Sequence, residues 1–122
     1  MDLIHICQEL QSLGITANYK GYQQTALAVQ LALQDEDRLR HVTKEIYWVV
    51  ADQIGCGQST VERNIRTAAQ VAWKINPARL QRLAGYPFRA SPSASELISI
   101  LTSHFQRMAD AAKSSDLAGV PG

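Results

Sequence analysis

Apolar residues recur along this chain at intervals of three and four, the spacing that gathers them on one face of an α-helix. We find no stretch with the clear alternation of apolar and polar residues that is typical of a half-buried β-strand. The pattern predicts about six helices, over residues 3–13, 21–34, 44–54, 59–75, 78–83 and 96–112. We therefore expect an all-α protein.

Residues with strong capping preferences mark the expected ends of these helices. Thr43 and Ser95 are predicted N-caps, and Ser59 with Glu62 has the spacing of a capping box. Asn76, followed by proline, should end one helix and open the next. The side chains expected to point inward are Ile46, Val49, Val50 and Ile54 in the third helix, and Leu97, Ile100, Leu101, Phe105 and Met108 in the last.

Length and composition indicate one globular domain. The chain has 122 residues, of which 46% are hydrophobic, enough for a single core. We expect residues 1–113 to form the domain and residues 114–122 a flexible C-terminal tail. No apolar run approaches the roughly 20 residues that span a bilayer, and the N-terminus does not resemble a secretory signal. We therefore expect a cytoplasmic protein with no membrane partner.

The residue types that usually carry catalysis or bind metals are scattered. The two cysteines and three histidines have no metal-type spacing, and no paired carboxylates, catalytic Ser-His-Asp set or phosphate-binding glycine loop is visible. The sequence therefore predicts no catalytic residues, no metal site and no cofactor, and it argues against an enzyme.

Positive charge is concentrated in the middle of the chain. The net charge is only +1, yet residues 44–90 hold seven basic and three acidic residues, a local net charge of +4. The segments on either side are both net negative. Such an excess suits a surface that contacts phosphate, and it equally suits a solvated basic face.

Within that segment, residues 51–66 are predicted to form two helices joined by a glycine-containing turn, a helix-turn-helix. At about 100° per residue, Glu62, Arg63 and Arg66 share one polar arc, opposite an apolar one. Arginine can donate two hydrogen bonds to guanine, and glutamate can accept one from cytosine, so this arc suits base reading in double-stranded DNA. The alternative is an ordinary surface pair between Glu62 and Arg66. The predicted backbone or flanking contacts are Ser59, Gln70, Lys20, Lys44 and Lys74.

Several short motifs, in a fixed order, resemble one known family. They are Leu13-Gly14-Ile15, Lys20-Gly21-Tyr22-Gln23, Thr43-Lys44 with Tyr47, Val61-Glu62-Arg63 with Ile65-Arg66, Val71-Ala72-Trp73, Gly85-Tyr86 and Ser95-Glu96-Leu97-Ile98. Together they are similar to the C-terminal effector domain of the stage-zero sporulation regulator A family of transcription factors, over about residues 3–112. The resemblance implies a six-helix DNA-binding domain with a central helix-turn-helix.

The resemblance also implies partners and residue roles. It assigns base reading to Glu62, Arg63 and Arg66, and binding to short DNA boxes as tandem or paired copies, which would make a homodimer on DNA. It implies contact with RNA polymerase sigma factor through about residues 79–86. The candidate contacts there are Arg79, Arg82 and Tyr86.

The sequence departs from the family pattern in several respects, among them Asn64 and Thr67 beside the predicted reading residues. Family proteins carry an N-terminal receiver domain, and these 122 residues include none, so we expect an effector that lacks its own phosphoacceptor. Trp48-Val49 replaces the family's Pro-Asp, which predicts a straighter first helix of the motif. The loop after Tyr86 is shorter. With the low net charge, this loop favours the alternative of an interaction module that pairs with a full-length regulator or with polymerase and does not bind DNA.

Overall fold

The computed structural model describes residues 2–118, with side chains described as far as residue 112. It contains six α-helices and two short helical segments, and no strand occurs in the described range. In order they are α1 (Leu3–Ser12), α2 (Lys20–Gln34), the 3-10 helix η1 (Glu36–His41), the π-helical turn η2 (Thr43–Tyr47), α3 (Trp48–Ile54), α4 (Gln58–Ile75), α5 (Pro77–Ala84) and α6 (Ala94–Ala118). The all-α prediction is confirmed.

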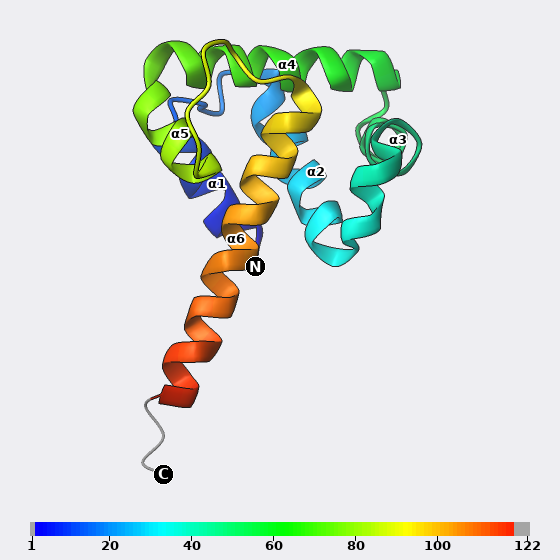
Figure 1. The fold of residues 1–122 in the computed structure, drawn as a ribbon. Coiled ribbons are helices and arrows are strands. Elements are labelled where there is room, and N and C mark those ends of the chain that lie inside the picture. The colour runs from blue at the N-terminus through cyan, green and yellow to red at the C-terminus, as the bar shows by residue number, and fades with distance from the viewer. Residues whose placement is uncertain (1, 119–122) are drawn as a thin grey trace.

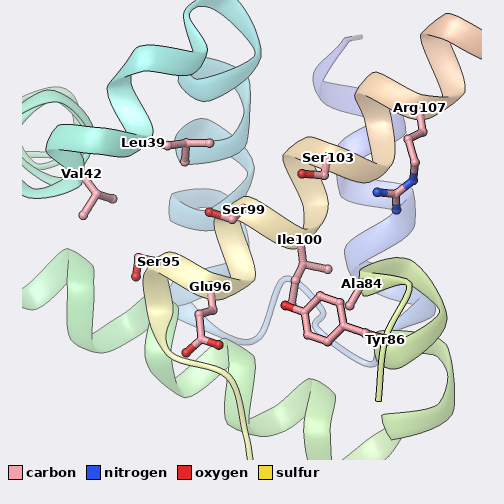
Figure 2. A pocket seen from close by; sticks show the side chains of 10 residues that line it. All are labelled: Leu39, Val42, Ala84, Tyr86, Ser95, Glu96, Ser99, Ile100, Ser103 and Arg107. Atoms are coloured by element: carbon pink, nitrogen blue, oxygen red, sulfur yellow. The ribbon is translucent and has the colours of Figure 1, made fainter. Parts of the chain in front are cut away.

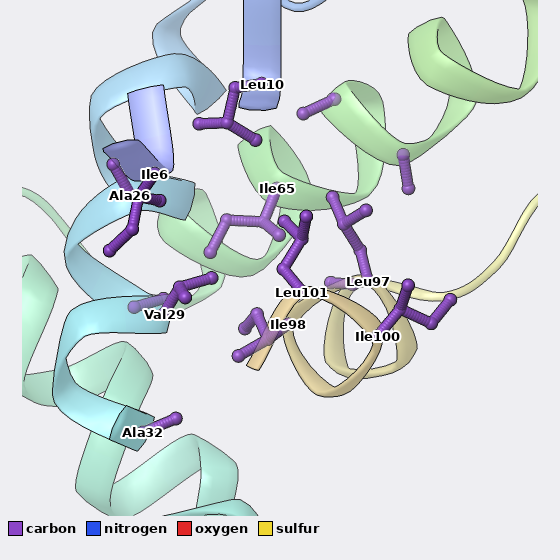
Figure 3. Close-up of a cluster of buried hydrophobic side chains, with 14 of the residues drawn as sticks. Ile6, Leu10, Ala26, Val29, Ala32, Ile65, Leu97, Ile98, Ile100 and Leu101 are labelled. Carbon is purple, nitrogen blue, oxygen red and sulfur yellow. The ribbon is translucent and has the colours of Figure 1, made fainter. Parts of the chain in front are cut away.

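Helix α4 lies across one side of the molecule, and the other helices lie beneath it in the view of Figure 1. Helices α2 and α6 pack against α4 and against each other, and α1 packs on α2. The core between them is aliphatic (Figure 3), and its large, fully buried members include Leu10, Val29, Ile65, Leu97 and Leu101. Each such side chain contributes roughly 1.5–3 kcal/mol by leaving water. The core therefore fixes which side of α4 faces inward.

A close approach between α2 and α4 sets where these two helices cross. A Cβ atom on Gly21 would lie 2.3 Å from the carbonyl oxygen of Asn64 and 3.0 Å from the Cβ of Ala68, so only glycine fits. One turn later, Asn64 Nδ2 donates to Gln24 Oε1 at 3.2 Å. The first two turns of α2 therefore hold the middle of α4.

The structure corrects all three predicted serine and threonine caps. Thr43 is not an N-cap, because η1 runs almost directly into η2 and no side chain caps the latter. Ser59 does not form a capping box, because α4 already begins at Gln58 and Gly57 occupies the cap position without a side-chain bond. Glu62 therefore takes no part in capping α4.

The cap of α6 lies two residues before the predicted Ser95. The Glu96 N–H donates to Ser93 Oγ, and the Ser93 N–H donates to Glu96 Oε1, both at 3.2 Å. This is a reciprocal capping box. The helix boundary at Asn76 is confirmed, since its side-chain oxygen accepts from the Arg79 N–H and Pro77 opens α5.

Two predicted core residues are exposed. Ile54 is the last residue of α3 and faces solvent beside the turn that follows. Met108 is exposed because α6 extends beyond the other helices (Figure 1). The backbone of α6 continues to Ala118, past the expected end near residue 112. Residues 119–122 of the predicted tail lie outside the described residues. No helix within the described range is long and apolar enough to cross a membrane.

Candidate nucleic-acid interface

The outer side of α4 carries the predicted reading residues. The helix has 18 residues and is therefore about 27 Å long. Its inner side is apolar and fully buried, with Val61, Ile65, Ala68, Ala69 and Ala72 all at zero exposure. The exposed side chains of its outer side are Ser59, Arg63, Arg66, Thr67, Gln70 and Lys74, with Glu62 partly exposed among them. We call these seven residues the α4 outer face.

A tight turn sets the angle between α3 and α4. Gly55 has a φ of +87°, in the left-handed region that favours glycine. Its N–H and that of Cys56 both donate to the carbonyl of Ala51, at 2.7 and 3.0 Å, and so close the end of α3. Val61 on α4 is fully buried and Ala51 nearly so. The two helices therefore form a helix-turn-helix that presents the α4 outer face to solvent.

Glu62 and Arg66 form an ion pair along that face. Arg66 Nη1 lies 3.1 Å from both carboxylate oxygens of Glu62, and the two side chains are 48% and 33% exposed, in that order. The i,i+4 surface pair weighed from the sequence is thus present. Arg63 takes part in no ion pair among the described side chains.

Tyr47 is a neighbour of this pair that sequence reasoning missed. Its side chain comes from η2, in the first helix of the motif, and is only 3% exposed. Burial, with a further contribution from the negative charge of Glu62, raises the pKa of Tyr47 to about 12. The phenol is therefore neutral at physiological pH, and it lies within electrostatic reach of the carboxylate. No local sequence signal links these two residues.

The three predicted flanking lysines lie at separate places, and all are exposed. Lys20 precedes Gly21, which contacts α4 at Asn64, so Lys20 lies beside the middle of the reading helix. Lys74 belongs to the last turn of α4, eleven residues or about 16 Å beyond Arg63. Lys44 lies in η2, at the far end of the first helix from the turn. The fold therefore places Lys20 beside the middle of α4, Lys74 near its C-terminal end and Lys44 on the first helix of the motif.

The three predicted polymerase contacts, in and just after α5, differ in their surroundings. Arg79 Nη2 and Nε donate to Glu9 Oε1 at 2.7 and 3.0 Å, and the Glu9 side chain is only 13% exposed. Arg79 is thus engaged by α1, an interaction across 70 residues that no local pattern could reveal. Arg82 and Tyr86 are exposed. Tyr86 contacts Phe88, which stacks on Trp73 of α4 at a centroid distance of 5.3 Å.

A hollow of about 290 Å³ lies along one side of α6, and Figure 2 shows the side chains that line it. On α6 its lining includes Ser95, Ser99 and Ser103, and Tyr86, from the loop after α5, lies beside Ile100 and Ala84. The lining of the hollow also includes the carboxylate of Glu96, which accepts a hydrogen bond from the Ser93 N–H in the N-terminal cap of α6. The described residues contain no group of three or more His, Cys, Asp or Glu side chains that could hold a metal ion.

Comparison with known protein families gives a match across most of the chain. Residues 6–105 match the family model described as Sporulation initiation factor Spo0A C terminal. The matched range begins within α1, includes all of α2 to α5, and ends within α6. It therefore contains the helix-turn-helix and the whole α4 outer face, and it confirms the resemblance found in the sequence.

Proposed function

The chain belongs to the Spo0A C-terminal family, the DNA-binding effector domains of sporulation regulators, and we propose that its α4 outer face reads base edges in the major groove of double-stranded DNA. The family is a regulatory one and not an enzyme family. The observation that carries the proposal is the α4 outer face itself. It combines two arginines and a glutamate on one solvent-facing side of a helix whose other side is locked in the core.

The chemistry of recognition follows from the donor and acceptor groups. Arg63 and Arg66 each present a guanidinium that can donate two hydrogen bonds to guanine O6 and N7, and Glu62 adds selectivity. Ser59, Gln70, Lys20, Lys44 and Lys74 contact the phosphate backbone or flank the site, which fixes the register of the protein but specifies no base. The protein thus acts as a sequence-specific transcription regulator in the cytoplasm, associated with the nucleoid when bound.

The wider assembly is part of the same proposal. Two copies bind paired DNA boxes as a homodimer, and the α5 segment contacts RNA polymerase sigma factor. Arg82 and Tyr86 support that contact because both are exposed, whereas Arg79 contributes mainly by holding α5 to α1.

Selection of bound duplexes from a random pool tests the proposal and identifies the site. Replacing Arg63 by Ala should weaken binding to the selected site by about 1–3 kcal/mol and relax the preference at one base position. Arg82→Ala, which removes the same charge from an exposed position on α5, should leave every base preference unchanged. Equal affinity of the wild-type protein for selected and scrambled duplexes would refute the proposal.

A second function, an interaction module that modulates a full-length regulator or polymerase without binding DNA, is favoured by one observation. Glu62 neutralises the charge of Arg66, so Arg63 is the one arginine of the α4 outer face whose charge is not paired among the described residues. A face with less positive charge attracts DNA phosphate less strongly. A salt titration separates the two functions. Direct DNA binding should weaken linearly in a plot of log affinity against log salt. Absence of DNA binding, with retained binding to a regulator or polymerase, would establish the second function.

A further inference from the structure

Arg66 uses only part of its hydrogen-bonding capacity within the protein. A guanidinium has five N–H donors on three nitrogens. Only Nη1 is bonded, to the two oxygens of Glu62 at 3.1 Å each. The edge formed by Nε and Nη2 makes no hydrogen bond to the described residues. Arg66 can therefore donate two parallel bonds to a partner without leaving Glu62.

Glu62 is the more recessed member of the pair. Its side chain is 33% exposed against 48% for Arg66, and its charge is felt by the buried Tyr47 of the first helix of the motif. This carboxylate already accepts from Arg66 through both oxygens, which uses part of its acceptor capacity within the protein. It is well situated to limit the rotation of the arginine side chain, whose freedom would otherwise oppose binding.

We propose that Glu62 is a positioning residue, which holds the Arg66 guanidinium for bidentate recognition of guanine and confers selectivity through Arg66 without contacting a base itself. This inference rests on the proposed function, since it concerns how the same face reads DNA. It changes the role of Glu62 from a direct reader of cytosine to a support for its neighbour.

The pairing also affects binding to DNA of any sequence. Phosphate attraction depends on net positive charge, and the pair of Glu62 and Arg66 has none. Arg66 therefore adds geometric selectivity while adding little non-specific affinity. Arg63, which is exposed and makes no ion pair among the described residues, supplies the unpaired charge of the outer face.

A double-mutant cycle tests the proposal with the selected site and all its single base-pair variants. The proteins are wild type, Glu62→Gln, Arg66→Ala and the double variant. Glutamine keeps the size of Glu62 but removes its charge. We expect Glu62→Gln to relax the same base pair that Arg66→Ala relaxes, and to have no further effect on base preference when Arg66 is absent.

Non-specific binding provides an independent readout. Glu62→Gln should bind scrambled duplex about three- to tenfold more tightly at low salt, with a salt slope steeper by about 0.9, because one arginine is no longer neutralised. Glu45→Gln is the matched control. It removes a negative charge from an exposed position on η2, and it should change no base preference.

The outcomes separate this inference from the proposed function. If Glu62→Gln relaxes a different base pair, and does so also without Arg66, then Glu62 reads that base directly and the inference is overturned while the proposed function stands. Unchanged base preferences in Glu62→Gln would overturn it as well. If the wild-type protein does not discriminate between duplexes, both fail together. Thermal unfolding of each variant establishes that it is folded under the assay conditions.

Discussion

Tyr47 shows how a single side chain links the two helices of the motif. The residue is buried beneath α4, and its phenol lies close enough to Glu62 for the carboxylate to disfavour ionisation. A neutral phenol in this place tolerates the negative charge of Glu62, whereas a phenolate would repel it. Glu62 therefore has an uncharged phenol on its inner side and its ion pair with Arg66 on the outer face.

This environment predicts a loss of stability at alkaline pH. The pKa of Tyr47 is about 12 in the folded protein and about 10 in an unfolded chain, so only the unfolded state loses this proton between these values. Stability is therefore unaffected below pH 10 and falls as pH rises from 10 to 12. Between pH 9 and pH 11 the free energy of unfolding should drop by about 1.4 kcal/mol more in wild type than in Tyr47→Phe. Urea unfolding at the two pH values measures this, and an equal drop in both proteins would contradict it.

At the scale of elements, the sequence predicted the helices better than their ends. Periodicity located all six α-helices because each buries an apolar stripe. The pattern of serine followed three residues later by glutamate occurs at both Ser59 and Ser93, and it forms a capping box only at Ser93. Before Ser59, the left-handed conformation of Gly55 turns the chain so that α4 already begins at Gln58. The position of the N-cap therefore depends on the turn that precedes the helix.

For the candidate site, the sequence likewise predicted which residues share a helix face but not the contacts between helices. Helical periodicity alone predicts that Glu62, Arg63 and Arg66 share one side of the helix, and the structure places these three on the outer side of α4. The bond from Asn64 to Gln24 and that from Arg79 to Glu9 join residues 40 and 70 positions apart. Such contacts depend on how the helices pack, which no local pattern specifies.

The α6 cap gives a prediction with a close control. Ser93→Ala removes the side-chain oxygen that accepts from the Glu96 N–H, and it should lower the free energy of unfolding by about 1 kcal/mol. Ser95→Ala, in the first turn of α6, removes no bond to the backbone and should change it by less than about 0.5 kcal/mol. Denaturant unfolding of both variants measures the difference. A larger effect at Ser95 would show that the helix begins where the sequence alone suggested.

The crossing of α2 and α4 predicts an intolerance at Gly21. A methyl group there would meet the Asn64 carbonyl at 2.3 Å, and backbone cannot move aside as a flexible side chain can. Gly21→Ala should therefore destabilise the protein by about 1–3 kcal/mol or more. It should also weaken DNA binding, since the displaced helix is α4. Gly57→Ala is the control, because an added Cβ there has only one neighbour, at 3.9 Å, so the variant loses only the modest preference for glycine over alanine at the N-cap of α4. If both variants were equally stable, the helices would not cross as closely as described.

For the whole molecule, the ion pair between Glu9 and Arg79 ties the N-terminal helix to the segment after the reading helix. Glu9 is mostly buried, while Arg79 is about a third exposed, so water partly screens their attraction. Glu9→Gln leaves Arg79 with a neutral partner and should lower the free energy of unfolding by about 1–2 kcal/mol. Thermal or denaturant unfolding measures this loss, and Arg82→Ala on the exposed side of the same helix should show almost none.

The same variants separate a structural role of Arg79 from a role in binding a partner. Because the ion pair lies away from the α4 outer face, folded Glu9→Gln should bind the selected duplex with wild-type affinity. If Arg79 acts on polymerase only by holding α5 in place, Glu9→Gln and Arg79→Ala should weaken that contact to a similar degree, whereas Arg82→Ala should weaken it without loss of stability. A polymerase defect in Arg79→Ala alone, with Glu9→Gln unaffected, would show that Arg79 contacts the partner directly.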